Sequence, residues 1–328
     1  MQTFTGIEYI KIDVANKFGL DRLKWKDRLW WTDDNRSNLT SHSAQAKEPL
    51  AFDKAVRALV QAENGESLNH IMGLDATASN IQIMAAMSGC RESAKAVNLI
   101  DTGNREDVHE SVADEMTKIM DHKIDRNTIK KPLMTHFFGS EAQPRSIFGE
   151  GEGYDSFVGA VNNKLPGPAE LMHLFQAHWN PMATKYTWAM PDGHVVHIPV
   201  SEKVDKGLEI DEANHLRFTY RAEVVRPQQQ GKALAANIVH SVDGWMCREM
   251  IKRANVQGFY LATIHDCFYA HPNYMNKVRQ LYKEVMAEVA DMNMVTMILS
   301  QISGTYVGYH KLSSGLSQDI LESEYALS

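Results

Sequence analysis

The stretch "FYLATIHDCFYAHP", residues 259–272, is rich in aromatic and aliphatic residues and predicts a β-strand. Asp266 lies in its middle, directly after His265. An ionised carboxylate among apolar neighbours is unfavourable unless a positive group compensates its charge. We therefore expect a cation next to Asp266.

A second aspartate has a similar setting much earlier in the chain. The apolar stretch "HIMGL", residues 70–74, predicts a short strand that runs straight into Asp75. The following "SNIQIMAAMSG" predicts a helix, because Ser79 and Gln82 form a capping-box pattern and Gly89 suits its C-terminal end. Asp75 is thus expected at a strand-to-helix junction.

The two aspartates together indicate more than either does alone. A single aspartate at a strand end often caps a helix or binds a backbone amide. Two carboxylates on neighbouring strands repel each other, and a divalent cation relieves that repulsion, as in two-metal phosphoryl transfer. Mg²⁺ prefers carboxylate oxygens and is commonly completed by substrate phosphates. The pair Asp75 and Asp266 therefore predicts a site for two Mg²⁺ ions.

Between the aspartates, "RNTIKKPLMTHFFGS" predicts a helix with a functional stripe. Arg126, Lys130, Met134 and Phe138 recur every four residues, so a helix places them on one face. Two cations suit the phosphates of a nucleoside triphosphate, and the ring of Phe138 suits its base and sugar. The alternative is an amphipathic helix with Met134 and Phe138 in the core and solvated cations.

The composition limits the class of protein. The 328 residues are 44% hydrophobic and 23% charged, as in soluble proteins, and no long apolar run or signal sequence is evident, so we expect a cytosolic chain without a membrane span. Three scattered cysteines predict reduced thiols. The net charge of −7 argues against a chain that covers duplex nucleic acid alone, so any phosphate-binding face is local or belongs to a partner.

The rest of the chain gives weaker signals. Helices are expected over 16–65, 106–122, 125–140, 235–254 and about 275–291. The helix over 125–140 is interrupted by Pro132, which should start, kink or break it there. Residues 141–183 read as loop-rich. Residues 184–200 predict a hairpin around Asp192-Gly193, and the polar residues 200–231 end in a loop, "RPQQQGK".

Taken in order, these stretches resemble the single-subunit, bacteriophage-type RNA polymerases. The first catalytic stretch of that family is similar to "GLDATASNIQIMAAMSGCRESAKAVNL", and its R-x-x-x-K-x-x-x-M-x-x-x-[YF]-G helix is similar to "RNTIKKPLMTHFFG". Its histidine-bearing helix resembles "NIVHSVDG", its second catalytic stretch "ATIHDCF", and its C-terminal end "DILESEYALS". The resemblance covers residues 18–328 in the family's order.

The resemblance implies roles for individual residues. Asp75 and Asp266 would be the metal-binding carboxylates, and Lys130 a catalytic contact to the triphosphate. Contacts to the incoming nucleotide are implied for Arg126, Met134, Phe138, Gly139 and His240, with Arg22 as a further candidate for the triphosphate. His265 would lie next to the metal site.

Two positions depart from the family's pattern. Phe138 stands where these RNA polymerases usually have tyrosine, so its ring can stack but cannot hydrogen-bond the ribose. Asn80 stands where the RNA enzymes tend to have glycine and the related DNA polymerases glutamate. An asparagine facing the pocket would itself bond the sugar.

The resemblance also implies a fold and its parts. We expect an α+β right-hand polymerase: palm from 1–100 and 238–328 around a small antiparallel sheet, and mostly helical fingers over 101–237, with a specificity-loop-like hairpin at 184–231. The family's thumb and N-terminal domain have no room here. The chain therefore resembles the catalytic subunit of a split, heterodimeric phage polymerase in the cytoplasm of an infected bacterial host.

The expected function is DNA-directed RNA synthesis. Its partners would be a second subunit supplying thumb and N-terminal parts, the DNA template, the RNA product and ribonucleoside triphosphates, without a membrane. Two alternatives stay open at this point. One is a DNA-synthesising or primase-like polymerase of the same fold, and the other is a non-catalytic DNA-binding subunit.

Overall fold

Three short strands from distant parts of the chain form the sheet that carries both aspartates. They are β1 (Met72–Asp75), β6 (Ala262–Ile264) and β7 (Cys267–Ala270), antiparallel in the order β1-β7-β6. The structure is a computed structural model that describes residues 1–229, 231 and 233–328. Asp75 pairs with Cys267, and the amide of Ala76 donates to the carbonyl of Asp266 at 3.1 Å. The two aspartates therefore lie at the same end of the sheet.

The stretch 259–272 is a hairpin and not the single strand that its composition predicts. The strands β6 and β7 pair with each other, and the chain reverses between them at His265 and Asp266. His265 has a φ of 52°, in the left-handed region that tight reversals require. The turn contains no glycine or asparagine, so the sequence carries no signal from which it could be predicted. Asp266 consequently lies at the sheet's end and not within a strand.

The helix expected after Asp75 is present as α4 (Ser79–Ser88), and Gly89 ends it with a φ of 69°, as predicted. The predicted capping box is wrong, because Ala78 is the N-cap residue and provides no side-chain cap. The Gln82 amide instead donates to two carbonyls, and its oxygen accepts from the Tyr282 hydroxyl at 2.6 Å. Gln82 therefore makes buried hydrogen bonds to distant residues and does not make the predicted capping contact with Ser79.

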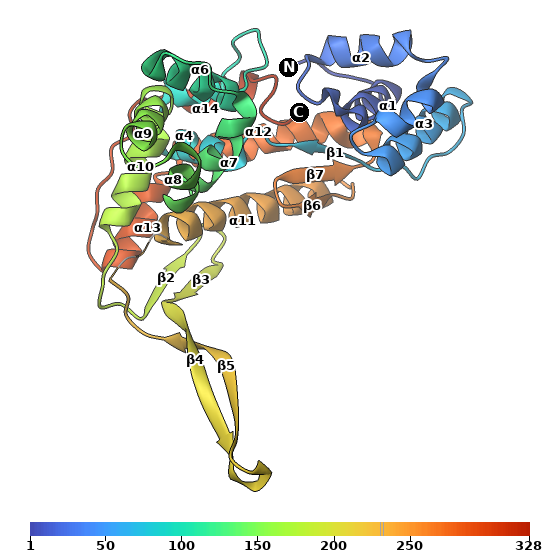
Figure 1. The fold of residues 1–328 in the computed structure, drawn as a ribbon. Helices are drawn as coiled ribbons and strands as arrows, with labels where there is room; N and C mark the ends of the chain where they lie inside the picture. Colours follow the sequence, from blue (N-terminus) through green and yellow to red (C-terminus); the bar gives the residue numbers. More distant parts are fainter. Residues whose placement is uncertain (230, 232) are drawn as a thin grey trace.

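The N-terminal region is largely helical, as predicted. Its elements are α1 (Gly6–Ala15), η1 (Asn16–Leu20), α2 (Trp25–Asp34), η2 (Leu39–Gln45) and α3 (Pro49–Glu63). Ile10, Phe52 and Leu59 belong to a separate small core between α1 and α3. Figure 1 shows this helical group beside the sheet, at the end opposite α9 and α10.

The middle of the chain is more helical than its sequence indicates. Besides α5 (Arg91–Ala96), the predicted helices appear as α6 (Val108–Met120) and α7 (Arg126–His136), which continues through Pro132 without a break. The loop-rich prediction for 141–183 is wrong, since this region forms α8 (Ala142–Phe148), α9 (Glu152–Lys164) and α10 (Pro166–Ala177). The prolines of "LPGP" occupy the first turn of α10, where a missing backbone N–H costs no helical hydrogen bond.

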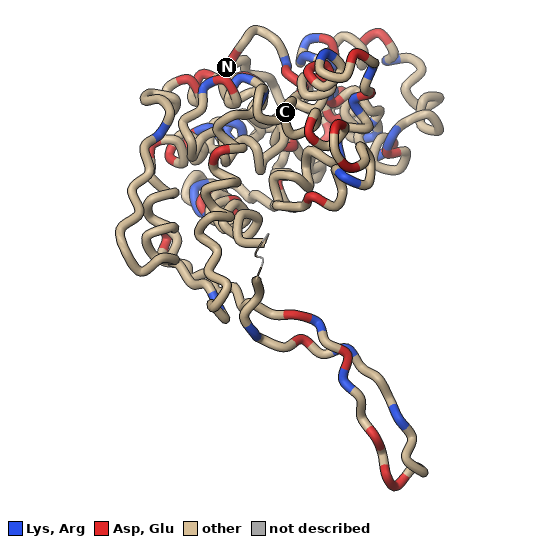
Figure 2. Tube along the Cα trace, turned by 60° about the vertical axis from the view of Figure 1, so that its left-hand side comes forward, with Lys and Arg blue, Asp and Glu red and all other residues tan. Residues whose placement is uncertain are grey.

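Two hairpins follow. The predicted one is β2 (Lys185–Ala189) with β3 (Val195–Pro199), turning through Asp192-Gly193 with Gly193 at a φ of 80°. The second consists of β4 (Ser201–Ile210), η3 (Asp211–Ala213) and β5 (Leu216–Val225). The residues themselves predicted only a polar stretch and a loop here, within the hairpin-like region 184–231 that the family resemblance implied. It projects away from the body (Figures 1 and 2). Residues 230 and 232 of the predicted loop lie outside the described residues.

The C-terminal part supplies the helices of the main core. The predicted helices are α11 (Ala233–Val256) and α12 (Met275–Asp291), which pack on each other and on α4. The remaining elements are η4 (Pro272–Tyr274), α13 (Met294–Ser303) and α14 (Leu316–Glu322). No helix in the described part of the chain has the length and apolar character needed to cross a membrane.

The architecture confirms the expected mixture of helices with small antiparallel sheets. The division into a palm (1–100 and 238–328) and fingers (101–237) stays a prediction. The tail after α14 returns to the central sheet, since Leu327 bridges to Ala76 and the amide of Ser328 donates to the carbonyl of Asp75 at 2.9 Å. The last residues therefore help to hold the strand-to-helix junction at Asp75.

Candidate functional site

A cleft of about 320 Å³ opens at the junction between β1 and α4. It is lined mainly by polar and charged residues, which come from seven separate segments of the chain. Four residues singled out in the sequence, Arg22, Asp75, Arg126 and Lys130, are among them. The fold thus collects these candidate side chains around one cavity, next to the sheet that bears Asp266.

The carboxylate of Asp75 is exposed at the end of β1. Its backbone is fixed on two sides, by pairing with Cys267 and by the hydrogen bond from Ser328. Two residues further on, the Thr77 hydroxyl donates to the carbonyl of Tyr325 at 2.8 Å. The C-terminal tail therefore restrains the backbone that presents Asp75 to the cleft.

Asp266 is half-buried in the turn between β6 and β7 and does not itself line the cleft. Burial raises the pKa of its carboxyl group, and the negative charge of Asp75 raises it further. Hydrogen bonds from its own amide and from Ser79 oppose the rise. The two carboxylates are therefore close enough to repel each other. Their oxygens form a donor set that fits a hard divalent cation such as Mg²⁺.

A third carboxylate approaches Asp266 from α11. Burial raises the pKa of Asp243 to about 6, the charge of Asp266 adds to the rise, and His265 opposes it. The Cys247 thiol, one turn further along α11, donates to the carbonyl of His265 at 3.6 Å. The helix α11 therefore packs directly against the turn that carries His265 and Asp266.

Phe138 lies next to His240 of α11. The helix expected over 125–140 ends at His136, so Phe138 lies in the turn after α7 and does not continue its helical face. The ring centroids of Phe138 and His240 are 4.8 Å apart, with an angle of 45° between the planes. Burial lowers the pKa of His240, and the charge of nearby His265 lowers it further. The Phe138 ring therefore packs on His240, and His265 of the Asp266 turn is near enough for its charge to act on His240.

Arg126 and Lys130 are both cations of the cleft, but a neighbouring carboxylate compensates only the charge of Arg126. The Arg126 Nε donates to the Asp107 carboxylate at 2.5 Å, and Asp107 caps the N-terminus of α6. Burial works to raise the pKa of Asp107, but hydrogen bonds from His109 and Arg126 hold it well below its usual range. Lys130 is exposed and forms no ion pair with any described residue. Its charge is therefore the more available to a ligand.

Five of the predicted nucleotide contacts do not line the cleft: Phe138 and His240, already described, and three others. Met134 is half-buried on α7, and Gly139, with a φ of 81°, donates its amide to the carbonyl of His136 just after that helix. Asn80 is 3% exposed; its oxygen accepts from the Ile81 amide, and its buried NH₂ group has no partner among the described residues. Contacts between these residues and a nucleotide stay predictions, and for Asn80 the side chain would first have to turn outward.

The structure also brings in residues that the sequence did not single out. Arg105 and Asp107 line the cleft, while Ser79 and Asp243 approach Asp266. Asp107 lies in the first turn of the helix predicted over 106–122, and Ser79 lies in the predicted capping box, but neither signal pointed to this site. Arg105 and Asp243 contribute through tertiary contacts that have no signature in a single sequence.

The arginines of the long hairpin are paired within the hairpin itself. Arg217 donates to Glu209 at 2.8 Å and Arg221 to Asp205 at 3.1 Å across the strands, and Arg226 pairs with Glu202. Figure 2 shows both signs of charge interspersed along this element. These pairs would have to open before the three arginines could contact bases or phosphates.

Comparison with known proteins gives a consistent family. The profile of the family described as DNA-dependent RNA polymerase matches residues 2–144 and 163–326. The mitochondrial DNA-directed RNA polymerase of Schizosaccharomyces pombe is 22% identical over 93% of this chain and 32% of its own length. A probable DNA-directed RNA polymerase of Neurospora crassa is 24% identical over 82% of this chain and 38% of its own length. Mitochondrial DNA-directed RNA polymerase 1 of Arabidopsis thaliana is 21% identical, with 92% and 37% covered.

The chain spans about a third of the length of the curated relatives it matches. These relatives overturn one prediction, that of the cytoplasm of an infected bacterial host. Several are mitochondrial or chloroplastic polymerases, which belong to the organelles of eukaryotes. The prediction failed because it rested on a likeness to phage enzymes, and the organellar enzymes share the same sequence motifs.

Proposed function

Because this chain belongs to the family of DNA-dependent RNA polymerases, we propose that it carries the catalytic centre for template-directed RNA synthesis by a two-metal mechanism. The observation that supports this most is the meeting of Asp75 and Asp266 at one end of the sheet, beside a cleft lined by Arg126 and Lys130. In the reaction, the 3′-hydroxyl of the RNA attacks the α-phosphate of a ribonucleoside triphosphate, and pyrophosphate leaves.

Asp75 and Asp266 would hold two Mg²⁺ ions, which when bound stabilise the charge on the attacking and leaving oxygens. The protein's own residues bind and orient the substrate. Lys130 is exposed and has no ion pair among the described residues, so it binds the phosphates. Arg126 joins it by giving up part of its contact with Asp107. Phe138 and His240 stack beneath the nucleotide and contact its sugar. Arg22 extends the positive wall of the same cleft.

The substrates in this proposal are a DNA template, the growing RNA and ribonucleoside triphosphates. Much of the phosphate-binding surface must come from outside this sequence, because the chain's net charge is −7 and the hairpin arginines are already paired. We favour a second polypeptide, carrying the thumb and N-terminal parts, as the source of this phosphate-binding surface.

The test is primed-template extension with Mg²⁺ and ribonucleotides by the protein assembled with its complementary polymerase parts. Asp75→Asn and Asp266→Asn should each reduce the rate about 1,000-fold, because each removes several kcal/mol of transition-state stabilisation. Asp34→Asn is the matched control, because Asp34 is exposed at the end of α2. Near-normal extension by either of the first two variants would refute the assignment.

One observation favours a second candidate, a DNA-synthesising polymerase of the same fold. Phe138 beside His240 offers no hydroxyl for ribose recognition, so the choice of sugar rests on fewer hydrogen bonds. Extension assays with ribonucleotides and deoxyribonucleotides in parallel separate the two candidates. A preference for deoxyribonucleotides would replace RNA synthesis by DNA synthesis without changing the catalytic residues. Absence of any metal-dependent extension would instead favour a non-catalytic DNA-binding subunit.

A further inference from the structure

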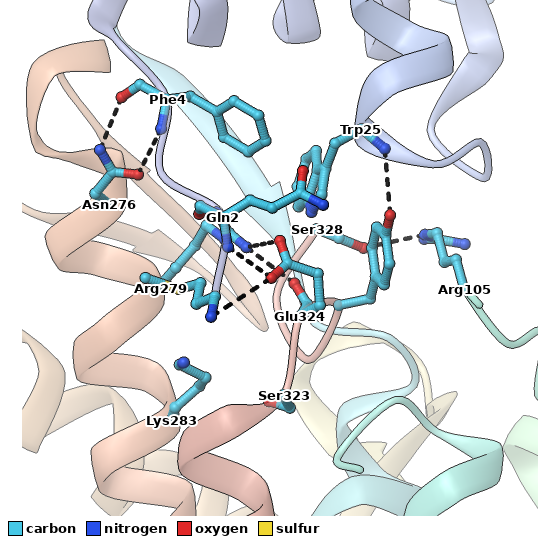
Figure 3. A network of polar contacts seen from close by, with 12 residues as sticks. Gln2, Phe4, Trp25, Arg105, Asn276, Arg279, Lys283, Ser323, Glu324 and Ser328 are labelled. Atoms are coloured by element: carbon cyan, nitrogen blue, oxygen red, sulfur yellow. Dashed lines mark hydrogen bonds and ion pairs between the residues drawn. The ribbon is translucent and has the colours of Figure 1, made fainter. Parts of the chain in front are cut away.

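Arg105 is a cation of the cleft that the sequence did not single out. It precedes α6 and lines the same cavity as Asp75, Arg126 and Lys130. Its Nε donates to the hydroxyl of Ser328 at 3.1 Å, as Figure 3 shows. Within the described part of the chain, its two terminal nitrogens donate to no residue. The outer end of the guanidinium group is therefore available to a ligand.

Nearby carboxylates compensate the positive charge of Arg105 only in part. Burial lowers its pKa, and the carboxylates of Asp21 and Asp107 only partly counter this effect. Asp107 already receives hydrogen bonds from Arg126 and His109, and Asp21 already pairs with Lys47 at 3.5 Å. Both nearby anions are thus shared with other cations.

Other arginines increase the local positive charge. Arg22 lies close enough to lower the pKa of Arg105, and Arg105 in turn lowers that of the buried Arg28, for which burial is the larger cause. A partly buried cation among other cations is unfavourable in the free protein unless an anion enters the site. The cleft therefore carries cations on the Arg22 and Arg105 side as well as on α7.

We propose that Arg105 is a further phosphate-binding residue, which holds the triphosphate of the incoming nucleotide and the pyrophosphate product together with Arg126 and Lys130. This inference rests on the proposed function of the cleft and identifies a residue outside the stripe on α7. Two free terminal nitrogens of a guanidinium group match two oxygens of one phosphate, a geometry that a lysine cannot provide.

The test is calorimetric titration of the full chain with inorganic tripolyphosphate in magnesium-containing buffer. Arg105→Gln and Lys130→Gln should each weaken binding about tenfold or more, since each removes charge-assisted hydrogen bonds. Arg91→Gln should leave binding unchanged, because Arg91 pairs with Asp319 and does not line the cleft. Arg105→Lys should restore only part of the affinity.

The outcomes separate the two proposals. Weakening by Lys130→Gln but not by Arg105→Gln would overturn the role of Arg105 and leave the proposed function intact. Tripolyphosphate binding that neither substitution affects would overturn both, because the cleft would then not be the nucleotide site.

A purely structural role for Arg105 gives a different pattern. If Arg105 only anchored the last residue, Ser328→Ala would weaken tripolyphosphate binding as much as Arg105→Gln. We expect Ser328→Ala to have a clearly smaller effect, because it leaves the guanidinium group in the cleft. Thermal unfolding of each variant shows whether it is folded, and equal losses of affinity in the two folded variants would overturn the proposal.

Discussion

His136 shows how one buried side chain on α7 couples the stability of this region to pH. It is 5% exposed, and its ring packs edge-on against Phe137 and Phe157, with centroids 5.4 Å away in both cases. Burial lowers its pKa to about 4, the charge of His173 adds to this effect, and Glu141 opposes it. The folded protein therefore keeps His136 neutral at a pH where the unfolded chain binds a proton.

The sign of the resulting pH dependence follows from linkage. Because the folded pKa lies below the unfolded value of about 6.5, the free energy of unfolding falls as the pH drops from about 6.5 to 4. One such proton contributes about 1.4 kcal/mol per pH unit. We expect His136→Phe to remove this component. The free energy of unfolding, measured with urea at pH 7, 6 and 5, should then fall less steeply with decreasing pH than in the wild type. His122→Phe, at an exposed histidine, is the control, and parallel curves for wild type and His136→Phe would contradict the assignment.

At the residue scale, the types and spacing of side chains predicted much of the site. The position of Asp75 at a strand-to-helix junction marked it as a candidate. The four-residue spacing of Arg126 and Lys130 predicted that both lie on one helix face, and both line the cleft. Arg105 and Asp243 escaped prediction because nothing in their neighbours distinguishes them from solvated charges. Their significance comes from burial and from contacts with residues far away in the sequence, which periodicity does not encode.

The β4–β5 hairpin is the element that contributes least to the core. Its ladder runs from Ser201 paired with Val225 to Ile210 paired with Leu216, and its side chains are mostly exposed. One face carries exposed Leu208, Phe218 and Tyr220, while the other carries the cross-strand ion pairs. A two-stranded hairpin alone is only marginally stable in water, so it gives the body little support.

Replacing residues 204–222 by Asn-Gly should therefore leave the thermal midpoint within about 2 °C of the wild type, because little buried surface is lost. The control is Trp188→Ala in the neighbouring hairpin. Trp188 is 1% exposed and its Nε1 donates to Ser241 at 3.1 Å, so its loss should cost about 3–5 kcal/mol. A large drop in midpoint for the shortened hairpin would mean that it packs on the body after all.

Prediction at the element scale succeeded where periodicity was strong and failed where tertiary structure overrode local signals. The helices α6, α11 and α12 and the Asp192-Gly193 hairpin lie where expected. The three helices between 142 and 177 were mistaken for loops, because the prolines and glycines that suggested breaks lie at helix ends, in first turns or within close packing. Gly153, for example, lies so near the carbonyl of Phe148 that a Cβ atom would clash at 2.1 Å.

At the scale of the whole molecule, a buried polar network joins the two ends of the chain to the core. Arg279 of α12 is 2% exposed and donates to the Glu324 carboxylate at 2.8 Å and to the carbonyl of Gln2 at 2.9 Å (Figure 3). The Gln2 amide donates to the other Glu324 oxygen at 2.8 Å. The segment after Glu324 continues to Tyr325 and Ser328, which restrain the backbone around Asp75.

Removing one member of this network should destabilise the protein strongly, because it leaves a buried charge without its partner. We expect Arg279→Met to lower the free energy of unfolding by about 3–5 kcal/mol, as measured by chemical denaturation. Glu324→Gln should also be destabilising, since the guanidinium group then lacks an anion. The double variant should lose less than the sum of the two single losses, because neither charge remains to be compensated. Strictly additive losses would show that the two side chains act independently, and the network would then not couple the chain ends to the sheet that carries Asp75.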